Sequence, residues 1–144
     1  MTDMINHPPH YAGVTIEPID ICERYPFALG CAIKYLARAG MKEGVSELED
    51  MKKARWYLER CADYGIPPVL FDAFGSSNAQ LRKFDRMIEL LFEKNVYLAR
   101  LFGLEEDGWH FAINKTRVRN TLYDIEERIE ILEEDEEDIE EEEY

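Results

Sequence analysis

Apolar residues recur every three or four positions along most of this 144-residue chain, which is the spacing of one face of an α-helix. No segment shows the alternation of apolar and polar residues between turn signals that is typical of a β-strand. The sequence therefore predicts an all-α protein. Hydrophobic residues make up 46% of the chain, enough for a core, and this excludes wholesale disorder.

Start and stop signals divide residues 1–65 into an extended arm and a three-helix unit. The arm contains His7-Pro8-Pro9-His10, which cannot be helical because proline disfavours helical geometry in the residue before it. We expect the first helix to run from Pro18 to about Tyr25 and the second from Phe27 to Ala39, with Gly40 as its C-cap. Ser46 and Glu49 form a capping box that starts a third helix, which Gly65 stops; its apolar face is Met51, Ala54, Leu58 and Cys61.

Residues 66–132 are expected to form a long helical hairpin, set off by a break at Ile66-Pro67-Pro68. Its first helix is predicted to run from Ser77 to Gly103 without interruption. Its second helix is predicted to begin between Trp109 and Lys115 and to end near Leu132. The apolar positions of this second helix alternate by four and three, as in a coiled-coil seam: Val118, Leu122, Ile125, Ile129 and Leu132. Two such seams predict a bundle or a homo-oligomer.

The net charge of −14 is concentrated at the C-terminal end. Residues 124–144 hold 14 acidic residues and one basic residue, a net of −13, so residues 1–123 carry only −1. Residues 133–144 contain a single aliphatic side chain, and we expect them to fray into a disordered acidic tail. A tail of this kind can solubilise the protein, or it can mimic nucleic acid or bind a basic partner protein.

Several classes of protein are excluded. No apolar run is long enough to span a bilayer, and the first residues do not form a secretory signal. The three cysteines, Cys22, Cys31 and Cys61, predict reduced thiols in a cytoplasmic protein. The body has no basic excess, which disfavours duplex DNA as a ligand. The chain also lacks a Walker P-loop and the other common nucleotide and hydrolase motifs.

Three cations gather around the end of the second helix. Lys34 and Arg38 lie one turn apart, and Lys42 follows just beyond Gly40. They could bind phosphate or pyrophosphate, with Arg38 contacting two oxygens. The alternative is a solvated helix end, where cations are favourable in any case.

Two acidic pairs, Glu17/Asp20 and Glu47/Asp50, lie near helix starts. If they faced each other, they could hold Mg²⁺ and leave its water ligands for a phosphate substrate. The alternative is the ordinary preference for acids in a first helical turn.

Aromatic and histidine side chains offer further contacts. His7 and His10 lie on one side of a polyproline-type arm, where they could contact phosphate or move protons, and Tyr11 could stack on a base. The alternative is an arm with surface histidines. Trp56 could be a nucleobase platform beside Tyr57 and neighbouring bases, but we expect it in the core, since tryptophan is usually well buried.

The order of these segments resembles a small bacteriophage family, the SaV-like proteins, which includes the P-loop-free nucleotide kinase of T-odd phages. Residues 6–60 carry the resemblance through the His7-Pro-Pro-His10-Tyr11 arm, the block from Gly30 to Lys42 and the block from Glu49 to Leu58. Residues 66–144 carry no resemblance that we can name.

The resemblance implies a phage protein in the host bacterial cytoplasm that binds a nucleotide and transfers a phosphoryl group to nucleoside monophosphates. It adds Lys53 to the binding residues Tyr11, Lys34, Arg38 and Lys42. Mg²⁺ would be held by Glu17, Asp20 and Asp50, and His7, His10 and Asp50 would be catalytic. Two alternatives stay open: a nucleotide pyrophosphatase, and an anti-defence protein that sequesters a host nucleotide signal or engages a host defence protein.

Overall fold

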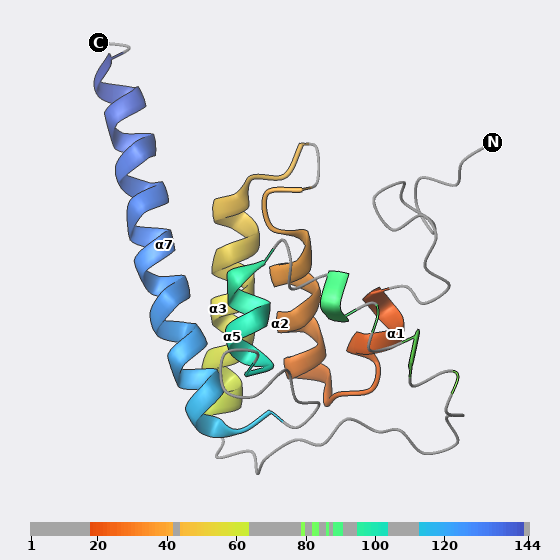
Figure 1. Ribbon diagram of the computed structural model, residues 1–144. Helices are drawn as coiled ribbons and strands as arrows, with labels where there is room; N and C mark the ends of the chain where they lie inside the picture. Colours follow the sequence, from red (N-terminus) through yellow and green to blue (C-terminus); the bar gives the residue numbers. More distant parts are fainter. Residues whose placement is uncertain are drawn as a thin grey trace, which may run out of the picture.

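The computed structural model describes residues 18–41, 44–63, 79, 82–83, 86, 88–90, 95–103 and 113–142, with side chains as far as residue 139. Every regular element in these ranges is a helix (Figure 1), which confirms the all-α prediction. The named helices are α1 (Pro18–Cys22), α2 (Phe27–Arg38), α3 (Glu47–Asp63), α5 (Val96–Leu101) and α7 (Lys115–Glu142). The predicted arm and the break after residue 65 lie outside the described residues.

The ends of α2 and α3 follow the predicted capping signals. Gly40 lies just past α2 with φ of 75°, a left-handed conformation that glycine adopts without strain. The Ser46 hydroxyl oxygen accepts a hydrogen bond of 3.1 Å from the backbone N–H of Glu49, as expected of a capping residue. Both helices therefore begin and end within about one residue of the positions that the sequence predicted.

One hydrophobic core joins the two predicted units. The helix α2 packs against α1 and α3, while α7 packs along α3 and α5. In Figure 1 the helices α3 and α7 run in opposite directions. The largest fully buried side chains come from both units, between α1 and the end of α5: Ile21, Leu29, Ile33, Leu36, Met51, Leu58, Ile88, Leu98, Leu101 and Phe102.

The prediction of one uninterrupted helix from Ser77 to Gly103 is wrong, because a new helix starts at Val96. Asn95 has an extended backbone (φ −144°), and its side-chain oxygen accepts hydrogen bonds from the N–H groups of Tyr97 and Leu98. Its side-chain amide also donates a 2.6 Å hydrogen bond to the Leu36 carbonyl of α2. Asn95 therefore caps α5 and attaches it to α2.

The predicted seam of α7 is real, and the chain itself covers most of it. Val118, Leu122, Ile125 and Ile129 are buried in the same core as α3 and α5. Three ion pairs between described residues link α7 to its neighbours: Arg128 with Glu47 of α3 at 2.9 Å, Asp124 with Arg100 of α5 at 3.4 Å, and Glu133 with Lys52 of α3 at 3.1 Å. The apolar surface that led us to expect a homo-oligomer is thus used within one chain, and the oligomer stays a prediction.

The helix α7 also extends well past Leu132, to Glu142, where the sequence predicted fraying. Figure 1 shows its C-terminal part projecting beyond the other helices. Glutamate is a good helix former, and extending a helix that packing has already nucleated costs little per residue. The described side chains from Glu133 to Ile139 are all exposed. None of the described helices has both the length and the apolar character that crossing a bilayer requires.

Candidate functional site

Three cations from two helices surround the ring of Tyr35. The charged atoms of Lys34 and Arg38, on α2, both lie 4.9 Å from the ring centroid. The ammonium nitrogen of Lys53, on α3, lies 5.4 Å from the same centroid. These distances are within the range of cation–π attraction. The structure therefore brings together three of the predicted phosphate-binding residues.

Aromatic rings continue this site along the edge between α2 and α3. Tyr57 stacks on Tyr35, with the ring centroids 5.9 Å apart and an interplanar angle of 11°. Phe27 and Trp56 each meet Tyr57 edge to face, at 6.3 Å and 5.0 Å. Arg60 lies over the Trp56 ring at 4.9 Å. We call the set the aromatic–basic face; its members are Phe27, Lys34, Tyr35 and Arg38 on α2, and Lys53, Trp56, Tyr57 and Arg60 on α3.

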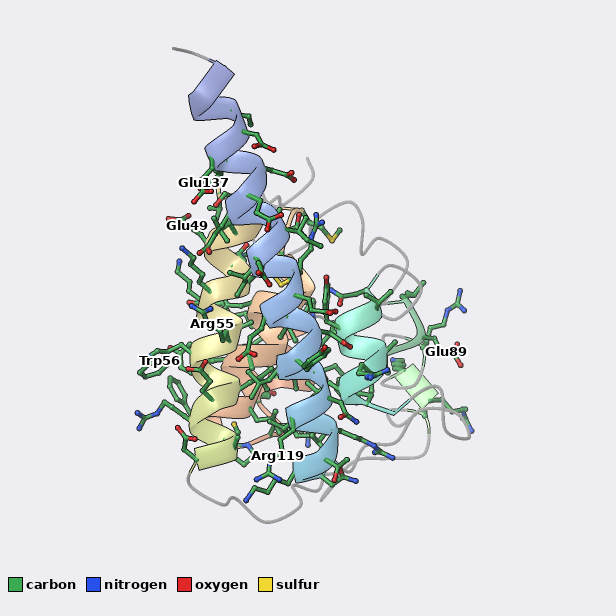
Figure 2. All side chains as sticks on the ribbon, turned by 90° about the vertical axis from the view of Figure 1, so that its left-hand side faces the viewer. Glu49, Arg55, Trp56, Glu89, Arg119 and Glu137 are labelled. Atoms are coloured by element: carbon green, nitrogen blue, oxygen red, sulfur yellow. The ribbon has the colours of Figure 1, made fainter. Side chains whose placement is uncertain are left out.

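The expectation that Trp56 belongs to the core is wrong, since 53% of its surface is exposed. Figure 2 shows the side chain projecting outward from α3. The reason is geometric: Trp56 follows the buried Met51 by five residues, which places it about 140° around the helix from the core-facing side. The position of Trp56 on the helix is therefore a better guide to its exposure than the average burial of tryptophan.

Arg38 is held by a buried carboxylate. Its Nη2 lies 2.7 Å from Oδ1 of Asp50, and its Nε donates to both carboxylate oxygens at 3.2 and 3.3 Å. Asp50 is 0% exposed, whereas 23% of the Arg38 side chain is exposed. The hydrogen bonds to Asp50 raise the pKa of Arg38, so the guanidinium stays charged. Nη1 has no acceptor among the described residues, so Arg38 can still donate to an anion.

The described acidic residues do not assemble the predicted magnesium site. Asp50 is occupied by Arg38, and the Glu47 carboxylate accepts hydrogen bonds of 2.9 and 3.0 Å from Arg128. Asp20 lies on α1, and Glu17 is outside the described residues. Within the part of the chain that the structure describes, no three His, Cys, Asp or Glu side chains come together in a way that could hold a metal ion.

Four other predicted site residues, His7, His10, Tyr11 and Lys42, also lie outside the described residues. The sequence reasoning missed Phe27, Tyr35 and Arg60. A second line of residues at helical spacing, next to the buried apolar residues of each helix, could have indicated them. On α2 this line is formed by positions 27, 31, 35 and 38, and on α3 by positions 50, 53, 57 and 60.

The hydroxyl of Tyr57 stays protonated at neutral pH. Desolvation raises the pKa of Tyr57, and the neighbouring Cys31 and Tyr35 side chains raise it further. The face thus presents neutral rings and positive charges, and the Asp50 carboxylate that pairs with Arg38 is buried.

Comparison with known proteins gives a match over the N-terminal part of the chain. Residues 5–59 match a family model described as a protein of unknown function (DUF3310). No curated protein and no solved structure matches the chain. The matched segment contains α1, α2 and most of α3, and it therefore includes every member of the aromatic–basic face except Arg60.

Proposed function

We propose that this chain is a nucleotide-binding protein whose binding site is the aromatic–basic face. The observation that supports it best is the convergence of Lys34, Arg38 and Lys53 on the ring of Tyr35, since two helices contribute to one positive site. Cations bind phosphate, and exposed rings beside them can stack on a base.

The charges of the face suit a phosphate group. Asp50 neutralises one of the three positive charges around Tyr35, which leaves a net of about two there, close to the charge of a phosphate monoester at neutral pH. Neither Lys34 nor Lys53 forms an ion pair with a carboxylate among the described residues. The bond to Asp50 orients Arg38 before any ligand arrives, so less side-chain entropy is lost on binding.

Phosphoryl transfer to nucleoside monophosphates in a phage-infected bacterial cytoplasm is the activity that we propose first, on the strength of the resemblance. Such a reaction needs mainly positioning and electrostatic stabilisation, which a P-loop is not required to supply. In this proposal Lys34, Arg38 and Lys53 bind phosphate, Asp50 positions Arg38, and His7 and His10 remain the proposed proton-handling groups. Mg²⁺ would arrive bound to the phosphates of the substrate, and Glu17 and Asp20 are the proposed protein ligands of the ion.

Sequestration of a nucleotide signal without turnover is the second candidate. It is favoured by the position of Asp50, whose carboxylate is fully buried and already bound by Arg38. A buried carboxylate in that state stabilises a binding group and offers no oxygen to a metal ion.

Calorimetric titration of the full chain with deoxynucleoside monophosphates, with and without Mg²⁺, tests the binding proposal. We expect the double variant Lys34→Ala/Lys53→Ala to bind at least about tenfold more weakly, since each lysine is a charge-assisted phosphate donor. A matched control removes two exposed cations elsewhere, Lys83→Ala/Lys115→Ala, and should bind normally. Equal affinity in the two double variants, or no binding by the natural chain, would contradict the proposal.

An assay with ATP then separates the activities. Formation of a nucleoside diphosphate identifies a kinase, and release of pyrophosphate from a triphosphate without an acceptor identifies a pyrophosphatase. Recovery of the intact ligand after heating identifies sequestration.

A further inference from the structure

Two rings of the aromatic–basic face are open to solvent, and two are not. The exposed fraction is 80% for Phe27 and 53% for Trp56. In contrast, the ring of Tyr35 is stacked against Tyr57 and is approached by three cations, and both tyrosines are partly buried. The face therefore offers two exposed rings to a ligand, Phe27 and the part of Trp56 that Arg60 leaves uncovered.

The two open rings are close to each other. Each meets the edge or face of Tyr57 nearly at right angles, Phe27 at 81° and Trp56 at 88°. Their centroids lie 6.3 Å and 5.0 Å from that of Tyr57, and they can be no farther apart than these two distances taken together. The bases of a single strand can unstack from each other and splay apart onto protein rings, so two neighbouring nucleotides can reach both rings.

The cations lie where the phosphates of such a strand would need them. Lys34, Arg38 and Lys53 approach Tyr35, which stacks on the same Tyr57 that both open rings contact. Positive charge beside rows of aromatic rings is the combination with which proteins bind single-stranded nucleic acid. Protein interfaces, in contrast, are depleted of lysine at their centres.

A mononucleotide carries a single base and can use only one of the two rings. We propose that the aromatic–basic face binds a single-stranded ligand of at least two nucleotides in preference to a mononucleotide, with one base on Phe27 and another on Trp56. This inference rests on the proposed function for its phosphate contacts, but it names a different class of ligand.

A length series tests the inference with the full-length protein. Deoxyadenosine ligands of one, two and four nucleotides, each with a 5′-phosphate, compete with a fluorescein-labelled tetranucleotide, and anisotropy reports the displacement. We expect the affinity to rise about tenfold or more from one to two nucleotides, since a second stacked base contributes that much. The same sequence in a duplex should bind weakly, because its bases face each other and cannot stack on the rings.

Two variants test whether the gain in affinity from the second nucleotide comes from Phe27 and Trp56. Phe27→Ala and Trp56→Ala should each reduce the affinity for the dinucleotide to within about threefold of the natural chain's affinity for the mononucleotide. Tyr123→Ala on α7 is the matched control, because Tyr123 is also an exposed ring but lies off the face, and it should leave the length series unchanged. All three side chains are exposed, so circular dichroism should show folded protein in each case.

The outcomes separate the two proposals. Binding of a mononucleotide without any gain from the second nucleotide would overturn this inference and leave nucleotide binding standing. Absence of binding at every length would overturn both. An oligomer that dissociates in Phe27→Ala or Trp56→Ala, with oligonucleotide binding unchanged, would show that the rings form a protein interface and would also overturn the inference.

Discussion

The side chain of Asp50 sets the orientation of Arg38, and through it the geometry of the proposed anion site. A carboxylate with no exposed surface stays charged at low cost only if it is hydrogen-bonded, and Arg38 supplies three donor contacts of 3.3 Å or less. The pair crosses from α2 to α3, so it also fixes how the two helices meet. One interaction thus serves stability and binding together.

Replacing Asp50 by asparagine separates those effects. We expect Asp50→Asn to lower the free energy of unfolding by about 2 kcal/mol, measured in urea, because removing one partner of a buried pair is costly. Phosphate affinity should fall because Arg38 loses its orientation, and it should fall by the same factor with and without Mg²⁺. A loss confined to experiments with Mg²⁺ would instead assign Asp50 to the metal.

Two buried titratable groups near the start of α2 make the fold sensitive to alkali. Burial is the main cause that raises the pKa of Cys22 from its ordinary value of 9.0 to about 12, and burial also raises the pKa of Tyr25. Below pH 9 both groups are protonated whether the chain is folded or not. Between pH 9 and 12 the unfolded chain releases protons that the folded chain retains, so stability falls as the pH rises.

The melting temperature of the reduced protein should therefore decline above about pH 9. Cys22→Ala removes one of the two groups and should give a shallower decline, although its melting temperature at neutral pH will be lower because of the lost packing. Thermal melts from about pH 7 to about pH 10.5 measure both slopes. Identical slopes would show that Cys22 does not contribute.

At the scale of the elements, helix ends set by neighbouring residues could be predicted from sequence. The ends of α2 and α3 depend on Gly40 and Ser46, which act on backbone groups within a few positions. The break inside the fourth predicted helix, where α5 starts, depends instead on Asn95, whose amide reaches a carbonyl 59 positions earlier in the chain. The apolar spacing of that segment carried no sign of such a distant contact.

The candidate site, too, could be predicted from the sequence only where its residues are neighbours on one helix. Lys34 and Arg38 could be predicted as neighbours because they lie one turn apart on one helix. The approach of Lys53 from α3 and the stacking of Tyr57 on Tyr35 depend on how α2 packs against α3, which helical periodicity does not specify. The partners of two predicted metal-site acids were hidden for a similar reason, since Arg38 and Arg128 reach Asp50 and Glu47 from other helices.

Substitution of Asn95 tests its double role as a cap and an anchor. Asn95→Ala should lower the free energy of unfolding by about 2 kcal/mol, about half from the lost cap and half from the unpaired Leu36 carbonyl. Asn95→Ser keeps a capping oxygen but has no amide donor, so it should lose about half as much. Equal losses in the two variants would show that only the hydrogen bond to α2 matters.

For the whole molecule, the net charge of −14 misrepresents the surface that a ligand meets. The positive face lies on α2 and α3, while most of the negative charge lies on the C-terminal part of α7. That part is attached to the helix bundle by Lys52 of α3, which pairs with Glu133 at 3.1 Å, and the described side chains beyond Glu133 are exposed. We therefore expect the acidic end to act on an anionic ligand through its long-range field, which salt screens.

Truncation after Glu133 removes nine acidic residues and changes the net charge from −14 to −5. Because the truncation spares the buried seam and the pair of Lys52 with Glu133, the melting temperature should stay within a few degrees of the natural value. Affinity for an anionic ligand should rise severalfold at about 20 mM salt and by less than about twofold at 500 mM, since the screening length shrinks as salt is added. A gain in affinity that persists at high salt would mean that the acidic end blocks the aromatic–basic face by direct contact, and a loss of affinity would mean that it helps to bind the ligand.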